Sequence, residues 1–145
     1  MGVEWGLDRV AKLPTGKYAK GPTLGPEPKV QLTKTEDVDR ACRALLNAIP
    51  DPARREIALP SGKNVFAECY DPWTNTIVIP DYPSQAERQR LLEHGMGHAR
   101  GGSHPEGLGH GEWTEAPWSA WYGKKPNVFA GEEPPVSTGN VFRGK

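Results

Sequence analysis

One predicted helix that carries two histidines constrains the fold of this chain most strongly. The four histidines of the 145 residues are His94, His98, His104 and His110. Ser84 and Glu87 form a capping box, which predicts the start of a helix, and the Gly101-Gly102 pair predicts its end. Residues four apart on a helix project from the same face. His94 and His98 can therefore reach a single cation.

A third histidine is available to complete the ligand set. His104 follows His98 by six residues, beyond the two glycines, and can fold back towards the helix. Three protein ligands with an open position for water are typical of a catalytic zinc site. The sequence therefore predicts that Zn²⁺ is bound by His94, His98 and His104. Four nearby residues could also supply the third ligand: Glu106, His110, Glu112 and Glu115.

The histidine spacing resembles the metzincin zinc signature H-E-x-x-H-x-x-G-x-x-H. His94, His98, Gly101 and His104 match the three histidines and the glycine of that signature, over about 11 residues. No methionine follows Met96 to provide the methionine turn of metzincins, so the comparison is with zincins in the wider sense. The resemblance implies a zinc metallopeptidase, a hydrolase that cleaves peptide bonds with zinc-activated water.

The chain departs from the signature at one catalytic position. Gly95 stands where the family has the glutamate that accepts a proton from the zinc-bound water. Glycine cannot accept a proton, and Glu93 points about 200° away from position 95 around the helix. Loss of a general base costs about 10²–10⁴ in rate. The sequence therefore predicts an inactive or weak variant, in which Gly95→Glu is expected to raise hydrolysis.

A second helix and a hairpin are predicted before the metal helix. A capping box from Thr33 to Glu36 predicts the start of the first helix, and the proline-rich segment 50–52 ends it. β-branched and aromatic residues at 64–70 and 76–79 predict an antiparallel hairpin. Ile57–Leu59 is a candidate third strand. The predicted fold is α+β, a small zincin-like domain with a short antiparallel sheet packed on the metal-binding helix.

The resemblance also implies where a substrate lies. In zincins an extended peptide adds to the edge strand of the sheet. Strand 76–79, a few residues before the metal helix, is the expected edge. We therefore expect a peptide or protein substrate along the hairpin edge.

Glycine and proline, with 17 and 15 residues, make up more than a fifth of the chain. This predicts extended termini, with an N-terminal arm over 1–32, a zincin-like metal-binding domain over 33–122 and a C-terminal tail over 123–145. Such arms also suit an alternative function, a non-enzymatic assembly protein. In that case the zincin scaffold belongs to a phage virion or tail-associated structural protein, and the arms bind neighbouring subunits.

Charge, targeting signals and cysteine content indicate which partners and which cellular location to expect. The 18 basic and 18 acidic side chains balance, so no nucleic-acid or membrane-surface partner is expected. No signal peptide or membrane span is recognisable, which predicts a cytoplasmic protein, or one incorporated into a virion from the cytoplasm. Cys42 and Cys69 are expected to be reduced, partly buried thiols, and a disulfide between them is the alternative, without positive support in the sequence.

Overall fold

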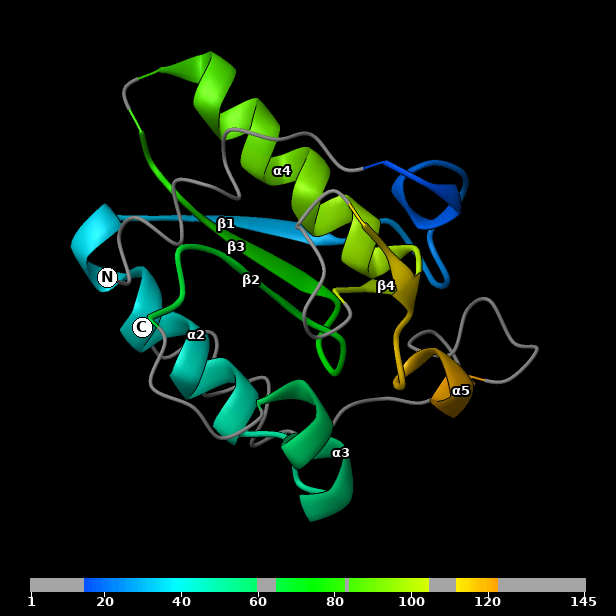
Figure 1. Cartoon of the computed structure of the whole chain (residues 1–145). Coiled ribbons are helices and arrows are strands. Elements are labelled where there is room, and N and C mark those ends of the chain that lie inside the picture. The colour runs from blue at the N-terminus through cyan, green and yellow to red at the C-terminus, as the bar shows by residue number, and fades with distance from the viewer. Residues whose placement is uncertain (1–14, 60–64, 83, 105–111, 123–145) are drawn as a thin grey trace.

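The computed structural model of the chain, which describes residues 15–59, 65–82, 84–104 and 112–122, has a small sheet with a helix on each face (Figure 1). Its elements are η1 (Lys17–Ala19), β1 (Lys29–Thr33), η2 (Thr35–Asp37), α2 (Val38–Asn47), α3 (Pro52–Ala58), β2 (Cys69–Asp71), β3 (Thr76–Pro80), α4 (Gln85–Ala99), β4 (Gly102–Ser103), β5 (Thr114–Glu115) and α5 (Ser119–Tyr122). The predicted α+β class is confirmed. Within the described part of the chain, no helix has both the length and the apolar character that a membrane span needs.

The main sheet is mixed, with strand order β1-β3-β2. β2 and β3 form the predicted antiparallel hairpin, although β2 is shorter than the predicted strand 64–70. β1 pairs with β3 in parallel on the other side. The prediction that strand 76–79 is an edge strand is therefore wrong, because both sides of β3 are hydrogen-bonded. The edges of the described sheet belong to β1 and β2.

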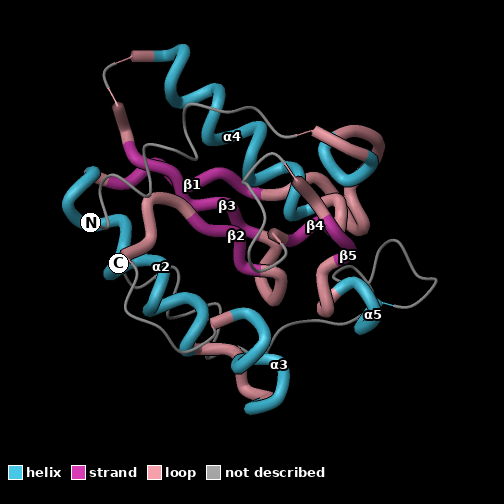
Figure 2. Tube along the Cα trace, in the orientation of Figure 1, coloured by secondary structure: helices cyan, strands magenta, loops and turns pink. Residues whose placement is uncertain are grey.

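The side chains of β3 point alternately to the two faces of the sheet, so the core has two layers, one under each helix (Figure 2). Ile77 and Ile79 face α4, where they pack in a cluster with Leu91. Val78 faces α2 and packs in a cluster with Leu45. Successive strand residues point to opposite faces of a sheet, so one short buried strand supports both helices.

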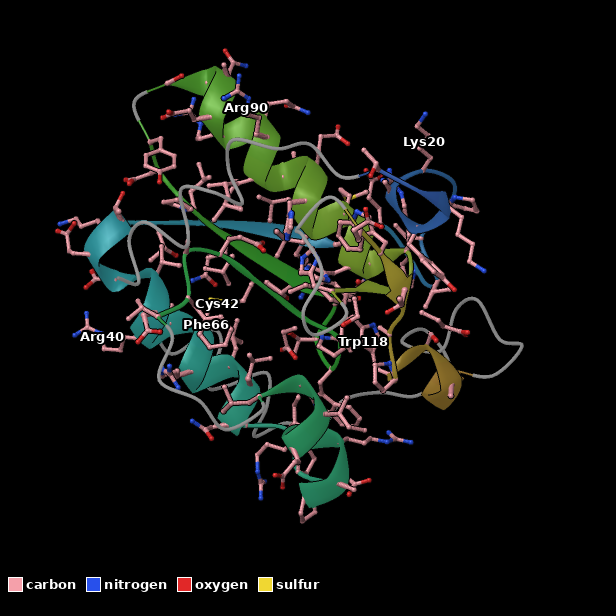
Figure 3. The ribbon with its side chains drawn as sticks, viewed as in Figure 1. Lys20, Arg40, Cys42, Phe66, Arg90 and Trp118 are labelled. Atoms are coloured by element: carbon pink, nitrogen blue, oxygen red, sulfur yellow. A yellow bond between two sulfur atoms is a disulfide. The ribbon has the colours of Figure 1, made fainter. Side chains whose placement is uncertain are left out.

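Figure 3 shows how the side chains divide between core and surface. Lys20, Arg40 and Arg90 extend away from the chain, and their charged ends reach solvent. Cys42 and Trp118 lie inside, at 0% and 8% exposure. The charged side chains of Arg40 in α2 and Arg90 in α4 are therefore solvated.

Two secondary-structure predictions fail in the first half of the chain. Thr33 ends β1 instead of capping a helix, and its hydroxyl accepts a hydrogen bond from Gln31. Pairing with β3 overrides the local capping signal. The predicted strand Ile57–Leu59 is also wrong, because α3 covers Ile57 and Ala58. Asp51 caps this helix by accepting from the Ala53 N–H at 3.1 Å.

Part of the predicted N-terminal arm packs on the domain. The Arg100 guanidinium donates to the carbonyl of Ala19, and the Leu24 N–H donates to the Ala99 carbonyl at 3.1 Å. Ala19 and Leu24 thus lie against the C-terminal end of α4, the Pro26 carbonyl accepts a hydrogen bond from Asn75, and β1 joins the sheet. Residues 1–14 and the predicted tail over 123–145 lie outside the described residues.

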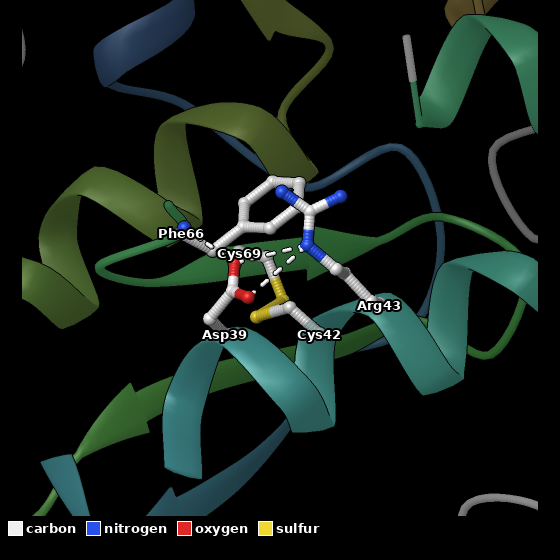
Figure 4. A network of polar contacts seen from close by, with 5 residues as sticks. All are labelled: Asp39, Cys42, Arg43, Phe66 and Cys69. Atoms are coloured by element: carbon white, nitrogen blue, oxygen red, sulfur yellow. Dashed lines mark hydrogen bonds and ion pairs between the residues drawn. A yellow bond between two sulfur atoms is a disulfide. The ribbon is translucent and has the colours of Figure 1, made fainter. Parts of the chain in front are cut away.

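A disulfide fastens α2 to the hairpin (Figure 4). Cys42 and Cys69 are bonded, with their Cα atoms 6.0 Å apart. The prediction of reduced thiols is therefore wrong, because folding brings two distant cysteines to the separation typical of disulfides. Beside this bond, Asp39 binds Arg43 at 3.1 Å and accepts from the Phe66 N–H at 2.8 Å. The hydrogen bond from Phe66 holds the segment before β2 against α2, and the ion pair with Arg43 orients the Asp39 carboxylate.

Candidate metal centre

The helix that carries the histidines follows its predicted limits. The Ser84 hydroxyl accepts a hydrogen bond from the Glu87 N–H at 3.4 Å, which caps the start of α4. The helix ends at Ala99, and Gly101 takes a φ of +96°, a backbone conformation that favours glycine. His94 and His98 are thereby held one helical turn apart.

The three predicted ligands come together at the end of this helix. Nε2 of His94 and Nε2 of His104 are 2.8 Å apart. One donor atom from each of His94, His98 and His104 lies within 4.8 Å of the others. Two ligands about 2.0–2.1 Å from one zinc ion stand at most about 4.2 Å apart. Donor atoms that all lie within 4.8 Å of one another are close to this limit, so the cluster could hold a metal ion.

A backbone carbonyl fixes the protonation of one ring. Nδ1 of His98 lies 2.9 Å from the carbonyl oxygen of Gly102. A carbonyl oxygen can only accept a hydrogen bond, so Nδ1 carries the proton and donates it. The lone pair of the neutral ring is then on Nε2. Metal-binding histidines are typically oriented by such a contact through the other ring nitrogen.

A small second sheet returns the chain so that His104 reaches the helix. β4 pairs with β5 in antiparallel fashion, with Gly102 opposite Glu115 and Ser103 opposite Thr114. Glu115 is exposed and accepts a hydrogen bond from Ser119, and it does not belong to the histidine group.

Glu112 also stays apart from the histidine group. Its side chain is exposed, and among the described residues the group that could hold an ion consists of the three histidines. Glu106 and His110, which the sequence also offers as third ligands, lie outside the described residues. The structure therefore favours His104 over Glu112 and Glu115 as the third ligand.

Trp113 packs against all three histidines. Its ring centroid is 5.3, 5.1 and 4.6 Å from those of His94, His98 and His104. A Cβ atom at Gly97 would lie 2.6 Å from this indole, and one at Gly102 would lie 2.4 Å from it. The two glycines therefore make room for Trp113.

The structure gives Gly95 a packing role. A Cβ atom at residue 95 would lie 2.6 Å from Cγ2 of Ile77 and 3.2 Å from its Cγ1 and Cδ1. Ile77 is fully buried in the central strand, and its branched side chain has little freedom to move. Position 95 thus faces the sheet, and a glutamate there has no room to begin its side chain.

A buried carboxylate beside the histidines is a candidate functional residue that sequence reasoning misses. Glu68, just before β2, has a side chain that is 2% exposed, and its Oε2 lies 3.6 Å from Nε2 of His94. The residue lies in the segment predicted as a strand. Its charge among apolar neighbours is the one sequence feature that could have identified it as a candidate. Fully buried carboxylates are uncommon, and one that lies beside candidate metal ligands is a candidate functional residue.

No family model, curated protein or solved structure matches this chain. The donor atoms themselves indicate what the site could bind. Those atoms are three imidazole nitrogens and one neighbouring buried carboxylate.

Proposed function

We propose that the chain is a zinc metallopeptidase-type domain in which His94, His98 and His104 hold the metal. The observation that carries this proposal is the convergence of the three rings, with donor atoms within 4.8 Å of one another. Neutral imidazoles suit Zn²⁺, and a three-histidine set leaves one position open for water. When bound, zinc supplies a Lewis acid and lowers the pKa of a coordinated water towards neutrality.

The residues of the chain prepare this site in distinct ways. The Gly102 carbonyl orients the His98 ring, and Trp113 covers one side of the three imidazoles. His94 is fully buried, so the donor atoms meet in surroundings where electrostatic interactions are strong. The edge of the hairpin in the described sheet is β2, which adjoins Glu68 and is the place we assign to an extended peptide substrate.

Metal analysis of tag-free protein tests the proposal. We expect about one zinc ion per chain, and its loss in His94→Ala, His98→Ala and His104→Ala. His110→Ala is the matched control, because it removes a histidine outside the proposed set and should keep the metal. A metal-free wild-type chain, or loss of zinc in His110→Ala with retention in His104→Ala, would contradict the proposed site.

Hydrolysis of an unfolded protein substrate then separates peptidase from assembly protein. Cleavage that disappears with the metal supports the peptidase. A chain that keeps zinc without cleaving supports the second candidate function, an assembly protein with a metal-stabilised scaffold. The exposed Val30 and Leu32 on β1, at 46% and 57%, favour this second function, because an exposed sheet edge can receive a strand from a partner.

A further inference from the structure

We infer that Glu68 is the acidic member of the metal centre and supplies, from the sheet, the carboxylate that position 95 cannot hold. This inference rests on the proposed function for the metal and adds a residue outside the histidine signature. Its first support is contact, because Oε2 of Glu68 lies 3.6 Å from Nε2 of His94, the same nitrogen that meets His104.

The Glu68 side chain points to the α4 side of the sheet. Tyr70 lies in the cluster with Ile77 and Leu91, on the α4 face. Glu68 lies in a bend just before β2, and the approach of its Oε2 to His94 places its side chain on the α4 face as well. Cys69, between them, turns to the opposite face and bonds to Cys42 in α2. The disulfide thus anchors the backbone from one side while Glu68 reaches the histidines on the other.

Burial gives the second support. The side chains of Glu68 and His94 are 2% and 1% exposed. Burial of a carboxylate is costly unless positive charge or hydrogen bonds compensate it. A divalent ion held by the three histidines would bring compensating charge to this carboxylate. The 3.6 Å between Oε2 of Glu68 and Nε2 of His94 is longer than a hydrogen bond, so the carboxylate is a close neighbour of this ligand nitrogen.

Gly95 gives the third support, because it shows why the carboxylate comes from another element. A side chain at 95 would collide with Ile77, so the helix packs on β3 at that point. The hairpin carries Glu68 to the neighbouring space beside His94. Because α4 packs closely on β3 at residue 95, the carboxylate beside His94 comes from the segment before β2 instead of from the helix.

In hydrolysis, Glu68 would perform the proton transfer. The oxygen of the attacking water bonds to the peptide carbonyl carbon, and one of its protons passes to Oε2 of Glu68. The C–N bond breaks as this proton is delivered to the leaving nitrogen. Water and peptide are thereby converted to a carboxylic acid and an amine, with no other reactant.

The test compares Glu68→Gln with Glu93→Gln in the full chain. Each change removes one carboxylate and keeps the side-chain shape. Glu68 is next to His94 in space, and Glu93 is next to it in sequence. Glu93 accepts a hydrogen bond from Gln89 on the exposed side of α4, so its charge lies apart from the site. Zinc affinity is measured by competition with a chelator, and the stability of the metal-free and zinc-loaded forms by urea denaturation.

We expect zinc affinity to fall about 10- to 100-fold in Glu68→Gln and to stay unchanged in Glu93→Gln. The zinc-loaded form of Glu68→Gln should lose more stability, relative to the wild type, than its metal-free form, because the carboxylate acts on the bound metal. Unchanged affinity in Glu68→Gln overturns the inference, as does equal destabilisation of its metal-free and zinc-loaded forms. If the wild type cleaves a substrate, zinc-loaded Glu68→Gln should cleave it about 10²–10⁴ times more slowly, and an unchanged rate would also overturn the inference. Absence of cleavage in the wild type refutes the peptidase alone, since affinity still decides the role of Glu68.

Discussion

Replacement of Gly95 by alanine should destabilise the protein, although alanine is the better helix former. In an open helix this change gains about 1 kcal/mol of stability. Here the added Cβ atom would stand 2.6 Å from Cγ2 of Ile77, and two more atoms of that side chain lie at 3.2 Å. Overpacking of a buried site costs about 1–3 kcal/mol. We therefore expect a net loss of up to about 2 kcal/mol, and a larger loss for Gly95→Glu.

A double-mutant cycle isolates the contact. Ile77→Ala alone removes a buried side chain and should cost about 2–5 kcal/mol. In that background the obstruction at residue 95 is gone, so Gly95→Ala should be stabilising by about 1 kcal/mol. The coupling free energy between the two positions is then about 1–3 kcal/mol, equal to the overpacking cost.

Urea denaturation of the four metal-free proteins measures this coupling. Arg90→Ala and Arg90→Gly provide the calibration, because Arg90 is exposed in the same helix and its alanine–glycine difference reports helix propensity alone. Additive effects at residues 95 and 77, within about 0.5 kcal/mol, would refute the packing argument. Increased hydrolysis by a fully stable Gly95→Glu variant would refute it as well, and would restore the expectation drawn from the sequence.

Two further predictions concern the hairpin. Free-thiol titration of the unfolded, unreduced chain should find no thiols, and two titratable thiols would refute the pairing. The free energy of unfolding of a Cys42→Ala/Cys69→Ala variant should fall by about 3–4 kcal/mol, given the 27-residue separation of the cysteines. Burial raises the pKa of the Asp71 carboxyl to about 6, although hydrogen bonds from Thr74 and Trp73 oppose this rise. The folded protein therefore binds a proton that the unfolded chain releases near pH 3.8, and this stabilisation is lost as pH rises through 6. Between pH 4 and pH 7 the wild type should lose about 2 kcal/mol relative to Asp71→Asn, and a constant difference between the two would contradict the assignment.

The sequence predicts the metal helix well because its signals are local. Ser84 caps the helix through a residue three positions later, and Gly101 ends it through its own backbone conformation. The four-residue spacing of His94 and His98 needs no knowledge of the rest of the fold. The same is true of the β2–β3 hairpin, whose turn joins strands adjacent in sequence.

The failures arise where distant segments decide the structure. Thr33 carries a capping signal but pairs with Pro80 across the sheet. The segment Pro50-Asp51-Pro52 is expected from the sequence only to end one helix. Asp51 before Pro52 also caps the start of the next helix, α3. The partners of Cys42 and of Glu68 depend on packing across the core, and no local pattern identifies them. Gly95 likewise has no explanation until Ile77 is seen beneath it.

The parallel pairing of β1 with β3 has a consequence for the order in which the chain folds. During synthesis Lys29 leaves the ribosome well before Thr76, its partner 47 residues later. The β2–β3 hairpin closes over a short turn, whereas β1 must wait for a long crossover that contains both α2 and α3. Contacts between distant residues form slowly, since closing a long loop has an entropic cost. The N-terminal strand is therefore expected to dock late, onto a hairpin that is already formed.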